Sequence, residues 1–124
     1  MILIDSSGWL QYFLDDALAD TYGVFIEGDE PILVPAVVLY EVYKTLQRQV
    51  DEDTADQAAL HLTRQIMVPL DAELALAAAD ISLRQSLPFA DAVIYAAADM
   101  HDASIVTSDQ HFAGLDRVQY IPKP

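Results

Sequence analysis

Cysteine is absent from the 124 residues, and basic side chains are scarce. Without a thiol, the chain has no disulfide framework, no cysteine nucleophile and no cysteine-based zinc site. The three histidines, His61, His101 and His111, are scattered and form no evident nucleophile–base pair. No apolar run approaches the roughly 20 residues that span a membrane, and no basic segment precedes the apolar start as in a signal peptide. We therefore expect a cytoplasmic protein without a membrane segment.

The charge balance is strongly acidic, because six Lys and Arg stand against twenty Asp and Glu, a net charge of −14. This balance argues against a broad basic face that grips nucleic acid. Acidic runs such as residues 51–53 are typical of solvated loops, of helix ends or of a salty cytosol. Binding of nucleic acid would therefore depend on bound metal and a local patch, and the surface would attract a basic partner.

Strand-like apolar runs alternate with helical patterns along the chain, with no repeat and no linker that would split it. Because 53% of the residues are apolar, residues 1–124 are expected to form a single domain with its own core. Strands are predicted at residues 1–4, 32–34, 66–70, 104–106 and 118–121. Helices are predicted at residues 6–14, 18–27, 35–49, 71–87 and 89–101, and a further helix is predicted to begin at residue 54. A short helix is predicted after residue 109.

Polar residues mark where several of these helices begin. Ser6 and Ser7 are expected to cap the first helix, Thr54 with Gln57 forms a capping box, and Asp71 caps an alanine-rich helix. Pro69 near the end of the third strand predicts that this strand lies at an edge of the sheet.

Four acidic residues follow or adjoin the predicted strands. Asp5 and Asp109 come directly after the first and fourth strands, Glu41 lies in the second turn of the helix after the second strand, and Asp91 lies in the first turn of an apolar helix. The alternation predicts a mostly parallel sheet with helices on both faces, and such sheets bind ligands outside the carboxyl ends of their strands. All four side chains are therefore expected at one edge.

Each acidic residue also has a purely structural interpretation. Asp5 and Asp109 are suited to cap helices, and Asp91 suits the positive end of a helix dipole. Glu41 interrupts an apolar stretch, where a carboxylate is costly unless it is paired or bound to metal. A salt bridge from Glu41 to Lys44 or Arg48 is the structural alternative. Four such explanations would have to hold at the same edge of the sheet.

The order and setting of these residues resemble the PIN domain, in particular the VapC-like toxins of toxin–antitoxin pairs. The matching stretches are residues 2–7, Glu41 in its apolar helix, residues 87–92, and residues 105–112 with a Thr-x-Asp-x-x-Phe segment. The resemblance implies a three-layer α/β/α sandwich around a mostly parallel sheet, and an endoribonuclease. It also implies an RNA substrate, a homodimer and a cognate antitoxin, for which the acidic charge predicts a basic segment that enters the acidic pocket.

The chemistry of the residues indicates metal-assisted hydrolysis. Clustered carboxylates bind Mg²⁺ or Mn²⁺, which activates water and neutralises charge on a phosphate. The residues expected to bind the metal directly or through water are Asp5, Asp91 and Asp109. Glu41 is either a further ligand or the group that positions the attacking water. The hydroxyls expected to hold the carboxylates in place are those of Ser6 and Thr107.

Two other functions fit parts of the pattern. Another Mg²⁺-dependent phosphoryl-transfer enzyme, such as a receiver, would show an acidic pair after the first strand and a late lysine. Serines follow Asp5 instead, and no lysine lies between Lys44 and Lys123. A catalytically silent PIN scaffold would show degraded acidic positions, whereas all four are present. His111 is expected to be solvated, and helical aromatics such as Tyr40 are expected in the core or a dimer interface.

Overall fold

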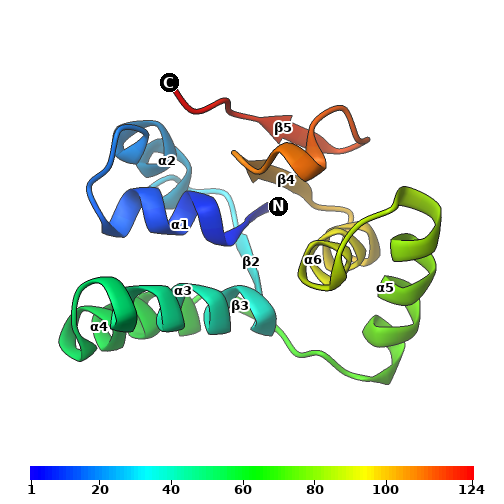
Figure 1. Ribbon diagram of the computed structural model, residues 1–124, viewed down its shortest axis with the longest axis horizontal. Coiled ribbons are helices and arrows are strands. Elements are labelled where there is room, and N and C mark those ends of the chain that lie inside the picture. Colours follow the sequence, from blue (N-terminus) through cyan, green and yellow to red (C-terminus); the bar gives the residue numbers. More distant parts are fainter.

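The computed structural model describes residues 1–124, which fold around a parallel sheet (Figure 1). Its five strands are β1 (Ile2–Ile4), β2 (Ile32–Pro35), β3 (Ile66–Val68), β4 (Ser104–Thr107) and β5 (Val118–Tyr120). They lie in the order β3-β2-β1-β4-β5, and every neighbouring pair is parallel. All residues of β1 and β2 are buried, which explains why their apolar runs show no polar alternation.

Helices cover both faces of the sheet. They are α1 (Ser6–Phe13), α2 (Ala19–Ile26), α3 (Ala36–Gln49), α4 (Glu52–Thr63), α5 (Ala72–Gln85) and α6 (Phe89–Met100), with a short 3-10 helix, η1 (Gln110–Phe112). Figure 1 shows α1 to α4 on one side of the strands and α5 and α6 on the other. Right-handed crossovers produce this division, because the chain moves outward from β1 to β3 and then returns to β4. The predicted three-layer α/β/α architecture is confirmed.

Aspartates begin four of the helical segments, and two of the predicted caps are wrong. Asp5, rather than Ser6 or Ser7, caps α1 by accepting a hydrogen bond from the backbone N–H of Gly8. Asp51, rather than Thr54, caps α4 in the same way. Asp5 and Asp51 each lie before the predicted cap and have extended backbone. The short carboxylate of each can therefore accept a hydrogen bond from the free backbone N–H three residues later in the chain. The caps of α5 by Asp71 and of η1 by Asp109 complete the set.

The core confirms the central place of α6, in which every residue from Asp91 to Ala98 is buried. Strand β3 lies at an edge of the sheet and ends just before Pro69, as predicted. Tyr40 is not a core residue, because 59% of its surface is exposed. It lies on the side of α3 opposite the buried stripe that contains Val38 and Val42. None of the helices is long and apolar enough to cross a membrane.

A crevice is expected where β1 and β4 end. These strands are neighbours in the sheet, but the chain continues from β1 toward β2 and from β4 toward β5, in opposite directions. Such a switch point separates the loops that follow the two strands and leaves space at the carboxyl edge of the sheet. Asp5 and Asp109 stand in these two loops. The topology therefore brings residues 104 positions apart in sequence to the same place.

Candidate active site

Asp5 is buried at the end of β1 and is held by three donors. Its Oδ1 accepts hydrogen bonds from the Ser7 hydroxyl at 2.6 Å and from the backbone N–H of Gly8 at 3.4 Å. Burial raises the pKa of the Asp5 carboxyl to about 6, the hydrogen bonds oppose this rise, and the negative charge of Asp109 adds to it. Gly8 is required here because a Cβ would overlap the side chains of Tyr22 and Ile4.

Thr107 at the end of β4 connects the two loops of the crevice. Its buried hydroxyl donates to Oδ2 of Asp5 at 2.7 Å and accepts from the backbone N–H of Asp109 at 2.9 Å. One side chain therefore fixes both the direction of the Asp5 carboxylate and the path of the chain into η1. Ser108 adds a second connection, since its backbone N–H donates to the Ser7 hydroxyl at 3.3 Å.

Asp91 extends toward the same loops from the first turn of α6. Its Oδ2 lies 2.6 Å from Nδ1 of His111, and the same nitrogen lies 3.4 Å from Oδ1 of Asp109. Burial raises the pKa of the Asp91 carboxyl, which the hydrogen bond from His111 opposes. The same hydrogen bond, together with the charge of Asp109, raises the pKa of the His111 imidazole. A protonated His111 thus offsets part of the negative charge.

Glu41 approaches from α3 and has the least satisfied carboxylate of the four. Its Oε1 is buried and accepts no hydrogen bond. Burial raises the pKa of Glu41, the nearby Ser6 hydroxyl opposes the rise, and the charges of Asp91 and Asp109 add to it. A buried acceptor without a donor costs free energy, so this oxygen is suited to a ligand that brings positive charge. The alternative salt bridge to Lys44 or Arg48 is not formed.

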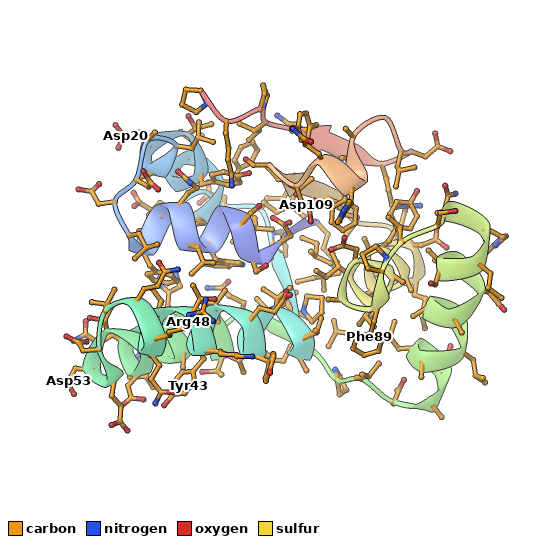
Figure 2. The ribbon with its side chains drawn as sticks, viewed as in Figure 1. Asp20, Tyr43, Arg48, Asp53, Phe89 and Asp109 are labelled. Carbon is orange, nitrogen blue, oxygen red and sulfur yellow. The ribbon has the colours of Figure 1, made fainter.

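The four carboxyl groups act on one another electrostatically. The charge of Asp109 raises the pKa of each of the other three, and the charge of Asp91 also raises that of Glu41. None of the four forms an ion pair with Lys or Arg. The structure thus brings together four acidic side chains from β1, α3, α6 and the loop after β4, and Figure 2 shows Asp109 in the middle of the view, between the starts of α1 and α6.

An entirely polar cleft of about 460 Å³ opens over Asp5 and Asp109. Its lining contains Asp5, Ser6, Ser7, Ser108, Asp109, Gln110, His111 and Lys123. Lys123 is the one Lys or Arg side chain in this lining, so an anionic ligand would meet little positive charge from the protein itself. A cleft with this composition is suited to cations or to a metal-bound anion.

The site residues predicted from sequence need two additions. Ser7, rather than Ser6, donates to Asp5, while Ser6 lies beside Glu41. His111 is solvent-exposed, as expected, but its imidazole is also paired with Asp91. Its backbone N–H donates to Oδ1 of Asp109 at 2.9 Å, which turns the imidazole toward the carboxylates. The signal in the sequence was the two-residue spacing between Asp109 and His111 in a capped turn.

The donor set fits a hard divalent cation. Asp91, Asp109 and His111 each offer one ligand atom, and these three atoms lie within 4.8 Å of one another. Carboxylate oxygens are the ligands that Mg²⁺ and Mn²⁺ prefer, and an imidazole is tolerated by Mn²⁺. The charges of Asp91 and Asp109 also act on Glu41, whose Oε1 has no hydrogen-bond partner. These residues can therefore hold a metal ion.

The chain was compared with models of protein families and with curated protein sequences. A family model described as PIN domain matches residues 2–118. A search of curated protein sequences finds no significant match.

Several solved structures share the fold. A toxin–antitoxin complex from Klebsiella pneumoniae contains a chain with a TM-score of 0.80 and 18% identity, over 98% of this chain and 100% of that one. The Mycobacterium tuberculosis toxin VapC20, which cleaves the sarcin–ricin loop, gives a TM-score of 0.78 and 21% identity, over 94% of this chain and 95% of that one. VapBC2 from Rickettsia felis, solved with a promoter DNA fragment, gives 0.74 and 13% identity over 100% of both chains.

Proposed function

The chain belongs to the PIN domain family, and from that premise we propose that residues 1–124 form one domain that cleaves RNA as a metal-dependent endoribonuclease. The observation that carries the proposal is the group of four carboxylates without a Lys or Arg partner, at the crevice between β1 and β4. Clustered carboxylates without a Lys or Arg partner are costly for folding, and a functional cation is the simplest reason to retain them.

The side chains have distinct roles in this proposal. Asp5, Asp91 and Asp109 hold Mg²⁺ or Mn²⁺, directly or through water. When bound, the cation supplies an activated water and neutralises charge on the phosphate oxygens. In this proposal water attacks the phosphorus, the P–O3′ bond breaks and the leaving 3′-oxygen takes up a proton, so the products carry a 5′-phosphate and a 3′-hydroxyl. The ion therefore supplies the positive charge that the acidic cleft lacks.

Glu41 either completes the metal site or positions the attacking water. Its Oε1 has no hydrogen-bond donor in the fold, so this oxygen can accept a proton from a water molecule. Hydroxyls from Thr107 and Ser7 fix the two oxygens of Asp5, and His111 orients Asp91. Fixed outer partners of this kind raise the affinity of a site for its metal.

A cleavage assay tests the proposal. Purified protein is incubated with total ribosomal RNA and tRNA in Mg²⁺, in Mn²⁺ or in EDTA, and the RNA ends are mapped. We expect cleavage with either metal and none in EDTA, and Asp5→Asn should lower the rate roughly 10³-fold or more. Asp71→Asn is the matched control, because Asp71 is also a helix cap but lies outside the crevice. Cleavage that persists in EDTA, or equal rates for wild type and Asp5→Asn, contradicts the proposal. An intact protein that binds metal without cleaving any of these RNAs would instead be a silent scaffold.

The biological role that fits best is the toxin of a toxin–antitoxin pair. Support comes from the fold shared with such toxins and from the net charge of −14, which favours a basic partner. In this proposal the antitoxin inserts a Lys or Arg into the acidic crevice and competes with the metal. Adding the antitoxin should then lower both Mn²⁺ affinity and cleavage, and an unchanged affinity contradicts this route of inhibition. A cytoplasmic homodimer is part of the same proposal, and sedimentation equilibrium tests it.

A further inference from the structure

An open apolar groove of about 540 Å³ reaches Glu41, one of the four carboxylates. Its lining contains Ala36, Val37, Tyr40, Glu41, Leu70, Phe89 and Ala90. Glu41 is the polar member of this lining and also belongs to the acidic group, so the groove and the candidate active site are continuous. A ligand bound at Glu41 therefore lies beside the groove.

Two exposed aromatic rings stand on this groove. Tyr40 in α3 is 59% exposed and Phe89 at the start of α6 is 68% exposed. They are the two aromatic residues among the large apolar side chains that the fold leaves exposed, and both line the same groove. Tyr40 directly precedes Glu41, and Phe89 lies two residues before Asp91 (Figure 2 labels Phe89). Exposed apolar surface gathered in this way marks a site of interaction.

A cation lies over the ring of Tyr40. Nζ of Lys44 is 3.3 Å from the Tyr40 hydroxyl and 5.4 Å from the centre of its ring. Lys44 is one of only six Lys and Arg residues in the chain. Because affinity for nucleic acid normally comes from many phosphate contacts, a chain this acidic needs another source of binding free energy. Stacking of bases on aromatic rings is such a source, and it does not depend on net charge.

We propose that Tyr40 and Phe89 form a stacking site for an unpaired base beside the scissile phosphate, with Lys44 contacting the adjoining backbone. The inference rests on the proposed ribonuclease function and adds a substrate requirement to it, a single-stranded nucleotide at the cleavage site. The rings are positioning and binding groups and take no part in the chemical step. A protein segment is the other kind of ligand that an apolar groove could bind. It would not account for the lysine beside the ring or for the continuity of the groove with the carboxylates.

Equilibrium binding to a non-cleaving protein tests the inference without relying on turnover. The Asp5→Asn protein is titrated in Ca²⁺ into fluorescein-labelled single-stranded RNA 12-mers of adenosine, of uridine, or of abasic ribose phosphate. Tyr40→Ala and Phe89→Ala are made in the same background. The control is Leu83→Ala, which removes an 85% exposed apolar side chain from α5, outside the groove. Tyr40→Phe and Phe89→Tyr keep the rings.

Stacking on one ring corresponds to roughly 5- to 150-fold in affinity, and we expect losses in that range for each alanine variant. The abasic 12-mer should bind as weakly to the parent protein as the adenosine 12-mer binds to Phe89→Ala. Ring-retaining variants and Leu83→Ala should bind like the parent. Lys44→Gln should reduce the slope of log affinity against log salt by about 0.7, the value for one phosphate contact on a single strand.

Unchanged affinity of both alanine variants, or equal affinity for the abasic and adenosine 12-mers, overturns the inference. A shift in the monomer–dimer equilibrium of these variants at unchanged RNA affinity also overturns it and assigns the groove to a protein contact. Failure of the ribonuclease proposal has a different signature. In that case wild type does not cleave RNA in Mn²⁺, whereas the dependence of binding on the rings is measured separately.

Discussion

Aspartates cap helices in two regions of this molecule, with opposite electrostatic results. Asp51 caps α4 at an exposed corner, where hydrogen bonds with Thr54 lower the pKa of its carboxyl. Asp5 caps α1 by the same local geometry, but burial and the charge of Asp109 raise its pKa to about 6. The local motif is the same in both places. The difference teaches that burial and neighbouring charge, rather than the cap itself, distinguish a candidate ligand from a structural carboxylate.

The largest expected difference between the two regions is their response to metal. In wild type, Mn²⁺ at about 100 times its Kd should add about 2.7 kcal/mol to the free energy of unfolding, because only the folded state binds it. Asp91→Asn should abolish this gain while leaving the metal-free protein as stable or more stable, since burial already disfavours the charged carboxyl. Thermal unfolding with and without Mn²⁺ measures both effects. Asp71→Asn should keep the full metal response, and a clear loss of metal-free stability in Asp91→Asn would assign Asp91 a structural role.

The pH dependence of the metal-free protein sharpens the same comparison. The folded pKa of Asp5, about 6, exceeds its ordinary 3.8, so the folded state binds more protons between these values and stability falls as the pH rises through this window. Lowering the pH from 7 to 5 should therefore add about 1.4 kcal/mol to the free energy of unfolding from Asp5 alone. The raised pKa of His111 acts in the same direction. The lowered pKa of Asp51 has the opposite effect on the pH dependence. The stability that Asp51 contributes is present above its ordinary pKa and is lost as the pH falls through its pKa in the folded protein.

Urea unfolding at pH 5 and pH 7 in EDTA measures this dependence. The Asp5→Asn variant has no carboxyl at this position and should show a correspondingly smaller gain on acidification. Equal gains in Asp5→Asn and wild type would show that the pKa of Asp5 is close to its ordinary value, and the contrast with Asp51 would then disappear.

The smallest expected effect concerns the structural caps. Asp71 accepts a hydrogen bond from the backbone N–H of Leu74 at 2.9 Å, and Asp71→Ala should lower the free energy of unfolding by about 1 kcal/mol. Cleavage by this variant should be unchanged at a temperature where it is fully folded. Circular dichroism during urea unfolding measures the first effect, and the RNA assay measures the second. Reduced cleavage by the folded Asp71→Ala protein would break the distinction between the two groups of aspartates.

Most secondary structure was predictable from the sequence because the local signals agree. The apolar strands, the proline before α3 and the alanine-rich pattern of α5 each select one conformation with little help from distant residues. The start of α1 at Ser6 was predicted correctly, but its cap was misassigned because three consecutive residues, Asp5 to Ser7, are all good caps. The cap is chosen by the point at which β1 ends, and that point depends on pairing with β4.

The proximity of Asp5 and Asp109 was also predictable, since strand ends in a parallel sheet meet at one edge. Their hydrogen-bond partners were not. Ser7 and His111 become neighbours of the carboxylates through turns whose side-chain directions depend on tertiary contacts, with Ser108 for Ser7 and with Asp91 for His111. Tyr40 was predicted to lie in the core or in a dimer interface, and its exposure excludes the core.

By itself, the sequence determined the alternation of strands and helices, the acidic balance, and the placement of two carboxylates after strand ends and two in apolar helices, because these follow from local propensity and from residue identity. Only the tertiary structure decided which aspartate is buried, which lacks a cationic partner and which aromatic rings remain exposed. Burial and Coulomb interaction depend on distances between residues far apart in the chain, such as Asp5 and Asp109. Folding sets those distances, and they in turn separate otherwise identical carboxyl groups.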